Sequence, residues 1–137
     1  MLLTPNISDY YKTSYIRIQI ELKLDCNITF IRGNSGSGKT FLWKALNSDS
    51  MLDHTLLALS YLTDDVLIRR RLLSAKNRLI CIDDADIILQ EDLINHIIED
   101  KFNQYIIIGH CEEYYKDVAC FKEIKFINNL LTLTDIR

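Results

Sequence analysis

The chain has 137 residues, close to the most common size of a single domain, so one hydrophobic core over residues 1–137 is expected. Apolar residues make up 48% of the chain and charged residues 26%, which excludes a disordered or fibrous protein. The 16 Lys and Arg against 19 Asp and Glu leave a net charge of −3, so no nucleic-acid partner is expected.

Apolar stretches with the periods of strands and helices alternate along the chain. Residues 15–22 alternate apolar and polar side chains, which predicts a half-buried antiparallel edge strand. The apolar run at 27–32 predicts a buried strand, and 39–46 predicts a helix. The later elements are expected as a strand or, given its leucines, a helix at 55–62, then a helix at 64–76, a strand at 78–82, a helix at 86–100, a strand at 104–108 and a terminal hairpin of 123–127 and 130–136. Buried strands separated by helices predict a mainly parallel sheet in an α/β sandwich.

The start of the chain and the cysteines give an expectation for the compartment. The first residues lack the basic and apolar regions of a signal peptide, and no apolar run approaches the roughly 20 residues of a membrane span. The four cysteines show neither a CxxC pair nor the spacing of a metal site: Cys26, Cys81, Cys111 and Cys120. They are therefore expected to be reduced thiols in a cytoplasmic protein.

One glycine-rich segment fits the phosphate-loop pattern G-x-x-x-x-G-K-[ST], called Walker A, at every fixed position. Its residues are Gly33, Asn34, Ser35, Gly36, Ser37, Gly38, Lys39 and Thr40. Backbone N–H groups of such a loop wrap a polyphosphate, and glycine permits that close approach. Lys39 would reach the β- and γ-phosphates, and the Thr40 hydroxyl would bind Mg²⁺. Phe41 follows and is included among the expected nucleotide contacts; an incidental glycine-rich turn is the alternative.

Two acids follow the apolar strand predicted at 78–82, a pattern known as Walker B. Asp83 would hold Mg²⁺, directly or through its water, because the tip of a buried strand keeps a carboxylate rigid. Asp84 would act as general base toward the attacking water, or would position that water. The alternatives are a cap at a strand-to-helix turn for Asp83 and a solvated acid for Asp84, since Asp86 also fits the N-cap of the next helix.

A third buried strand ends at Gly109 and His110. His110 at that tip would reach the γ-phosphate or the attacking water, and a partly exposed loop histidine is the alternative. The run Arg69-Arg70-Arg71 would supply an arginine to a phosphate, in this chain or in a neighbouring subunit, or would form a solvated helix face.

Together, the phosphate loop, the strand ending in two acids and the further strand with a polar tip resemble the P-loop NTPases of the additional-strand (ASCE) class. The local sequence is similar to ABC-type and AAA-type ATPase cores, over roughly residues 15–136. The resemblance implies a three-layer sandwich with sheet order 5-1-4-3-2, an antiparallel N-terminal edge strand and a C-terminal hairpin. It places the His110 strand between the loop strand and the Asp83 strand, and it implies ATP rather than GTP.

Several departures from those families narrow the expected activity. No glycine lies between Lys39 and Gly109, so an LSGGQ-type signature is impossible, and this stretch is too short for the helical subdomain of ABC ATPases. Asp84 stands where those ATPases usually have Glu. The expectation is an ATP-binding protein with slow Mg²⁺-dependent hydrolysis, whose site a second copy or a protein partner completes. A small-molecule phosphotransferase and a non-hydrolysing, nucleotide-gated interaction module are the alternatives.

Overall fold

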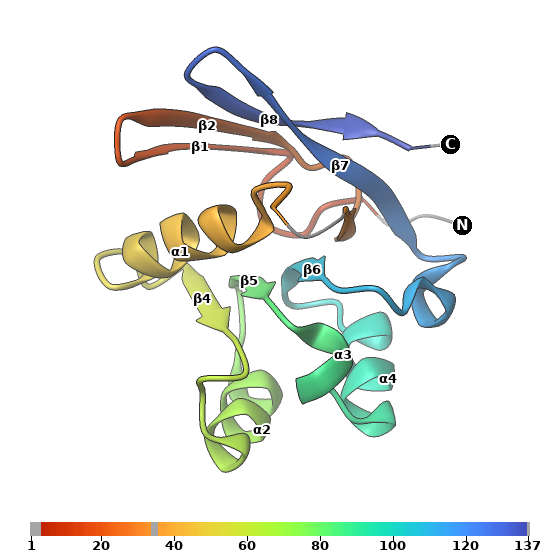
Figure 1. Ribbon diagram of the computed structural model, residues 1–137. Helices are drawn as coiled ribbons and strands as arrows, with labels where there is room; N and C mark the ends of the chain where they lie inside the picture. The colour runs from red at the N-terminus through yellow and green to blue at the C-terminus, as the bar shows by residue number, and fades with distance from the viewer. Residues whose placement is uncertain (1–3, 34–35, 137) are drawn as a thin grey trace.

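The computed structural model describes residues 4–33 and 36–136 (Figure 1). Eight strands, four α-helices and one 3₁₀ helix alternate along this part of the chain. In order they are β1 (Tyr10–Tyr15), β2 (Ile18–Lys23), β3 (Ile28–Arg32), α1 (Lys39–Ser50), β4 (Leu56–Leu59), α2 (Asp65–Ser74), β5 (Leu79–Ile82), α3 (Ala85–Ile88), α4 (Glu91–Glu99), β6 (Gln104–Ile108), the 3₁₀ helix η1 (Glu112–Tyr115), β7 (Ala119–Ile127) and β8 (Leu130–Asp135).

All eight strands belong to one mixed sheet in the order β1-β2-β8-β7-β3-β6-β5-β4. The run from β7 to β4 is parallel throughout, whereas β1–β2 and β7–β8 are antiparallel and β2–β8 is parallel. On β3, Phe30 lies opposite Ile107 of β6 and Phe121 of β7. The carboxyl ends of β3, β5 and β6 therefore open at the same rim of the sheet.

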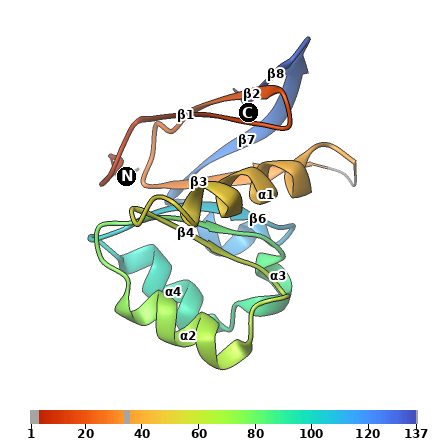
Figure 2. The same cartoon turned by 90° about the vertical axis from the view of Figure 1, so that its left-hand side faces the viewer.

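The sheet bends into a half-barrel around α1 (Figure 2). One core fills the space between α1 and both halves of the sheet, and it includes Ile20, Leu22, Leu24, Ile31, Leu42, Leu46, Ile106, Ile108 and Leu131. A second core lies on the opposite face of β3, β5 and β6, under α2, α3 and α4, and includes Phe30, Ile68, Leu72, Ile80, Ile82, Leu93, Ile97, Tyr105 and Ile107. The resulting layers are strands, helix, strands and helices.

The predicted three-layer sandwich with a mainly parallel sheet and order 5-1-4-3-2 is wrong. That order accounts only for the run β7-β3-β6-β5-β4, whereas the sheet has eight strands and is mixed. The N- and C-terminal strands close over α1 instead of bordering a sandwich. The alternation that buries Ile20 and Leu22 shows that one face of the strand is covered, but not by what. Sequence periodicity therefore could not distinguish a strand at the border of a sandwich from a strand that closes over α1.

The segment predicted as one edge strand at 15–22 is a hairpin turn followed by a strand. β1 and β2 are joined at Ile16 and Arg17, whose φ angles are 45° and 65°. A β-branched residue rarely adopts positive φ, and tight hairpins usually mark their turns with Gly, Asn or Asp. Nothing in the residue types therefore signalled this turn. The strand β2 is also not an edge, because it pairs with both β1 and β8.

The helix predicted at 86–100 is two helices. α3 ends at Ile88, the next residue Leu89 is extended with φ −100° and ψ 117°, and α4 starts after the extended Gln90. The stretch 55–62, for which the sequence allows either a strand or a helix, contains the strand β4. The predicted terminal hairpin is present as β7 and β8, which turn at Asn128 with φ 54°.

The expectation of four reduced cysteines is wrong for one pair. Cys26 and Cys120 form a disulfide with Cα atoms 5.8 Å apart, while Cys81 is a buried thiol and Cys111 an exposed one. Cys26 and Cys120 are 94 residues apart in sequence and come together only because β7 pairs with β3. The cysteines therefore no longer support the expected cytoplasmic location.

Among the residues that the structure describes, no helix is long and apolar enough to cross a membrane.

Candidate functional site

A cavity of about 290 Å³ opens at the carboxyl ends of the parallel strands, next to the start of α1. It is lined from three separate segments of the chain by Lys39, Thr40, Asp83, Asp84, Asp86, Ile87, Ile108, Gly109 and His110. The structure thus brings together the lysine and threonine of the glycine-rich loop, both acids after β5 and the histidine after β6. Crevices outside the carboxyl ends of strands are the usual ligand sites of parallel α/β sheets.

The described part of the glycine-rich loop has the backbone that its glycines permit. Gly36 and Gly38 have φ angles of 84° and 102°, a region that side chains disfavour. A Cβ atom on Gly38 would also lie 2.7 Å from Cε2 of Phe126. The Lys39 ammonium donates a hydrogen bond of 2.5 Å to the carbonyl of Gly33, so it folds back over the loop.

Two expected phosphate contacts, Asn34 and Ser35, lie outside the described residues. The neighbouring Ser37 hydroxyl is buried and has no hydrogen-bond partner among the residues described. A buried hydroxyl without a partner is unfavourable, and a phosphate oxygen in the loop would relieve that cost.

The start of α1 presents unpaired backbone donors to the loop. Gly38 is the N-cap and offers no side-chain acceptor, and the first turn contains no acidic residue. The first N–H groups of a helix lack intrahelical partners and carry the positive end of the helix dipole. An anion at this position would therefore be stabilised by α1 as well as by Lys39.

Asp83 is half-buried at the tip of β5. Burial raises the pKa of its carboxyl group, although the N–H of Asp84, which donates to Oδ1 at 2.9 Å, and the charge of Lys39 oppose this effect. Asp84 itself adopts φ 54° and is the residue from which α3 starts. A cation beside Asp83 would favour its ionised form.

His110 is exposed at the end of β6, and its backbone is held by Asp86, which no sequence pattern assigns to the site. The carboxylate of Asp86 accepts the N–H of His110 at 2.6 Å and the N–H of Cys111 at 2.9 Å. The sequence pattern predicts Asp86 only as the N-cap of the next helix. A short polar residue just after the acids was the available signal, but its partners are 24 and 25 residues away.

Phe41 does not line the cavity. Its ring packs edge-on against Tyr15, with centroids 5.4 Å apart, and against Phe126, with centroids 6.4 Å apart. Tyr15, Phe41 and Phe126 form an aromatic cluster beside Gly38, so the aromatic character of Phe41 is used for packing between α1 and the bent sheet.

A second cavity of about 230 Å³ shares His110 with the first and is lined also by Arg32, Gly33, Glu112 and Glu123. Arg32 forms a two-pronged ion pair with Glu112, and this hydrogen bonding raises the pKa of the Arg32 guanidinium. No local pattern marks this pair, since its members are 80 residues apart.

The three consecutive arginines do not enter the candidate site. Arg69 pairs with Asp92 at 2.6 Å and donates to Gln90 at 2.8 Å, and Arg71 lines a different cavity. Arg70 is exposed. The solvated-face interpretation fits Arg69 and Arg70.

Within the described ranges, no group of three or more His, Cys, Asp or Glu side chains could hold a metal ion by itself. Thr40 and Asp83 nevertheless line the same cavity, and a hydroxyl and a carboxylate are oxygen ligands of the kind Mg²⁺ prefers. Mg²⁺ usually takes only one or two protein ligands and completes its shell with phosphate and water. These two side chains therefore fit a phosphate-bound Mg²⁺ and not a metal held by protein alone.

Neither the known family models nor the curated proteins compared with this chain give a match.

Proposed function

We propose that this chain is a P-loop-type nucleotide-binding protein that holds Mg²⁺-ATP and hydrolyses it slowly. One observation carries the proposal. Lys39, Thr40, Asp83, Asp84 and His110 line one cavity at the carboxyl ends of parallel strands, at the N-terminus of α1. The proposal concerns the site alone and does not depend on the sandwich that was expected around it.

Phosphate binding is assigned to the loop backbone, the first turn of α1 and Lys39. Positive φ at Gly36 and Gly38 lets backbone N–H groups face an anion without interfering side chains. Lys39 would exchange the Gly33 carbonyl for a phosphate oxygen, which is a stronger acceptor for an ammonium group.

Thr40 and Asp83 are assigned to the metal. When bound, Mg²⁺ neutralises part of the triphosphate charge and orients the phosphates. Asp83 would bind as a carboxylate, and its raised pKa means that metal and proton compete for it.

Asp84 and His110 are assigned to the attacking water. The water oxygen would form a bond to the γ-phosphorus while the bond to the β–γ bridging oxygen breaks, giving ADP and phosphate. Asp84 would accept the proton of that water, and His110 would hydrogen-bond the water or a γ-phosphate oxygen. A carboxylate one methylene shorter than glutamate reaches less far, which is why slow turnover is expected.

The proposal also covers which nucleobase is bound, which partner completes the site and where the protein is located. ATP is favoured over GTP because the chain lacks an N-K-x-D guanine-reading motif. A homodimer or a protein partner would supply an arginine, since Arg69 is already paired and Arg71 lies elsewhere. A cytoplasmic location would provide both ATP and Mg²⁺.

Calorimetry with ATP and Mg²⁺ tests binding. Lys39→Ala should weaken ATP association about tenfold or more, since it removes a charge-assisted contact. Lys44→Ala is the matched control, because Lys44 is an exposed lysine of the same helix. No association of the wild-type chain with ATP, ADP or GTP at millimolar concentration contradicts the proposal.

Phosphate release then separates the three activities. Release without an acceptor that is lost in Asp84→Asn supports hydrolysis. ADP formation only with an added small-molecule acceptor indicates a phosphotransferase. Binding without release indicates a nucleotide-gated interaction module.

A further inference from the structure

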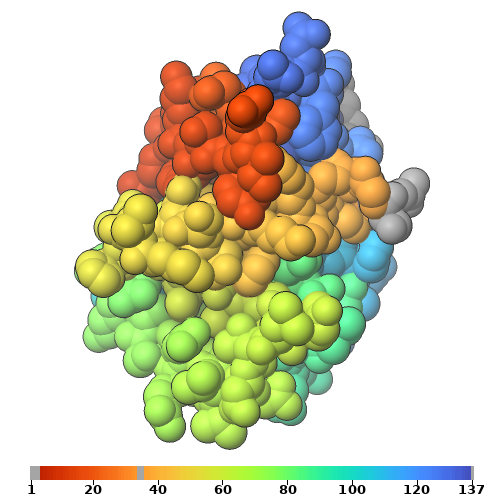
Figure 3. Space-filling view, turned by 60° about the vertical axis from the view of Figure 1, so that its left-hand side comes forward, coloured from red at the N-terminus to blue at the C-terminus, as the bar shows by residue number. Residues whose placement is uncertain are grey.

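A larger cavity, of about 650 Å³, lies away from the candidate nucleotide site. It lies between the end of α1, the strand β4, the end of α2 and the start of β5, and it shares no lining residue with the cavity at Lys39. Figure 3 shows the surface of α1, in orange to yellow, above that of α2, in yellow-green. The lining residues that matter here are Leu56, Leu57, Ala58, Arg71, Lys76 and Arg78. We call this cavity the β4 groove.

The floor of the β4 groove is the open edge of the sheet, because β4 is the last strand in the order. The N–H of Leu79 donates to Thr55 O at 2.7 Å, and that of Asp83 donates to Leu59 O at 2.9 Å. In a parallel ladder, alternate residues bond the same neighbour. The backbone groups of Leu56 and Ala58 therefore point away from β5, toward the groove.

This open edge is short. The N–H of Leu56 is already used, because it donates to Asp53 O at 3.2 Å. The carbonyl of Leu56 and both backbone groups of Ala58 are the strand positions that a further strand would use. An unpaired edge is a template for another extended segment.

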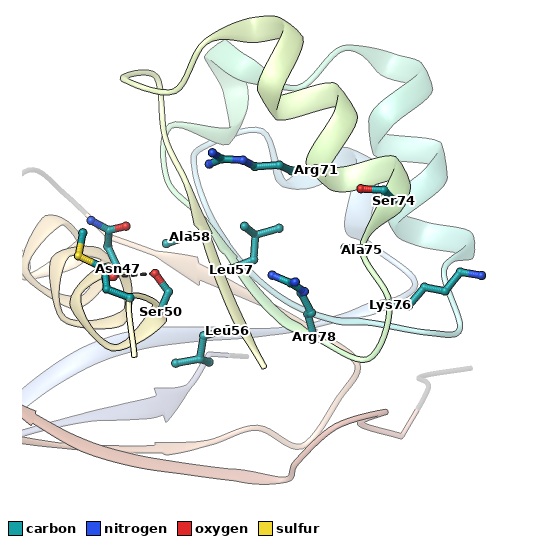
Figure 4. A pocket seen from close by; sticks show the side chains of 11 residues that line it. Asn47, Ser50, Leu56, Leu57, Ala58, Arg71, Ser74, Ala75, Lys76 and Arg78 are labelled. Atoms are coloured by element: carbon teal, nitrogen blue, oxygen red, sulfur yellow. Dashed lines mark hydrogen bonds between the residues drawn. The ribbon is translucent and has the colours of Figure 1, made fainter. Parts of the chain in front are cut away.

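The charged side chains that line the groove, Arg71, Lys76 and Arg78, are all basic. Among the residues described, neither Arg71 nor Arg78 forms an ion pair, although the chain as a whole carries a net charge of −3. Figure 4 shows the Arg71 guanidinium above Leu57 and the Arg78 guanidinium below it, both toward β4, while Lys76 points away. Two arginines thus face one open strand edge.

We propose that the β4 groove binds an acidic segment of a partner protein in extended form, as an additional strand beside β4. Backbone hydrogen bonds to Leu56 and Ala58 would give affinity, and carboxylates of the segment would pair with Arg71 and Arg78. Side chains alternate along a strand, so a segment with an acid at every second residue presents its carboxylates on one face.

A peptide fits the groove better than single-stranded nucleic acid does. Sites for single strands combine positive charge with aromatic platforms on which bases stack. The lining of the β4 groove contains no aromatic residue. It does contain backbone groups of β4 without a strand partner, and these form hydrogen bonds with a polypeptide backbone but not with a nucleic acid backbone in strand geometry.

Fluorescence anisotropy tests the proposal with a labelled peptide in which Val and Glu alternate over seven residues. The wild-type chain should bind this peptide, and Arg71→Glu with Arg78→Glu should weaken binding at least about tenfold. Arg70→Glu with Lys101→Glu changes the net charge equally at exposed positions outside the groove, and should leave binding unchanged.

Two further probes test the mode of binding on the wild-type chain, so that misfolding of a variant cannot decide the result. N-methylation of alternate peptide amides should abolish binding in the one register whose amides face β4, and replacing each Glu with Lys should also abolish it. Equal binding of the Lys peptide, no effect of N-methylation in either register, or tighter binding of a single-stranded oligonucleotide overturns the proposal. Lys39→Ala should bind the peptide normally, which separates this test from that of nucleotide binding.

Discussion

Asp86 and His110 are joined across two separate strand ends. The Asp86 carboxylate, on α3 two residues after Asp84, accepts the backbone N–H of His110 at 2.6 Å and of the next residue, Cys111, at 2.9 Å. The position of the loop after β6 is thereby fixed relative to Asp83 and Asp84. In the proposed reaction, Asp86 is a positioning residue that acts through His110.

Asp86→Ala should slow phosphate release about tenfold while changing ATP affinity less than about threefold, because it loosens His110 without removing a phosphate contact. The loss of two exposed hydrogen bonds should also cost about 1 kcal/mol of stability. Steady-state kinetics beside calorimetry makes the measurement, and Asp117→Ala, an exposed acid outside the cavity, is the control. An equal loss of kcat and ATP affinity would assign Asp86 to binding instead.

Gly109→Ala should reproduce the effect of Asp86→Ala. A Cβ atom on Gly109 would lie 2.8 Å from Oδ1 of Asp86 and 3.3 Å from its Cγ, so the carboxylate must move away from the His110 amide. Once Asp86 is replaced by alanine, that close contact no longer exists. The double variant should therefore release phosphate no more slowly than Asp86→Ala alone, and additive losses would contradict the mechanism.

Gly38→Ala should destabilise the protein more than Gly36→Ala. Both positions have positive φ, which costs a side chain about 1 to 3 kcal/mol, but only at Gly38 does the added Cβ meet a neighbour, Phe126. At Gly36 no atom lies within 4 Å. Urea unfolding measures the loss of stability caused by each substitution. The loss caused by Gly38→Ala should be smaller when Phe126 is also replaced by alanine. Equal costs at both glycines would mean that the Phe126 ring moves aside freely.

The residues of the candidate site were predictable because the signals are local. The glycine-rich loop is contiguous, and an apolar run followed by an acid or a histidine marks the carboxyl end of a buried strand. Parallel strands bring such ends to one rim, and the structure places Lys39, Asp83 and His110 around one cavity there.

What the sequence did not predict depends on contacts between distant residues. The pair Arg32–Glu112 and the disulfide between Cys26 and Cys120 span 80 and 94 residues and follow from strand order. The half-barrel depends on the hairpin turn at residues 16 and 17, which no residue type announces, and on the pairing of β2 with β8. Local propensity carries no information on either.

Reduction of the disulfide should lower the stability of the protein by about 4 kcal/mol, since Cys26 and Cys120 close a long loop and restrict the unfolded chain. Thermal unfolding with and without a reducing agent measures this effect. Cys26→Ser with Cys120→Ser should unfold like the reduced wild type, and Cys111→Ser, which alters an exposed free thiol, should keep the full effect of reduction. If purified protein reacts with four equivalents of an alkylating agent in denaturant, the bond is not formed.

Asp100→Asn should destabilise the protein at neutral pH, and the destabilisation should become smaller as the pH is lowered toward 3. Burial alone would raise the pKa of the Asp100 carboxyl, but hydrogen bonds from Tyr105, Asn103 and the Phe102 N–H hold it below its ordinary value. Because the folded state binds this proton less tightly than the unfolded state, the stabilisation is present above the unfolded pKa and lost as pH falls through the folded one.

At pH 7 the amide side chain of the variant cannot form the charge-assisted bonds, and its NH₂ group faces other donors. The free energy of unfolding should therefore fall by about 2 to 3 kcal/mol. Urea unfolding of both proteins at pH 7 and at pH 3 gives the comparison, and the gap should narrow at the lower pH. Tyr105→Phe removes one donor to the carboxylate and should show a smaller gap with the same pH dependence. If the difference in free energy of unfolding stays the same from pH 7 to pH 3, the carboxylate charge contributes nothing. The Asp100→Asn variant would then be destabilised by the shape of the amide.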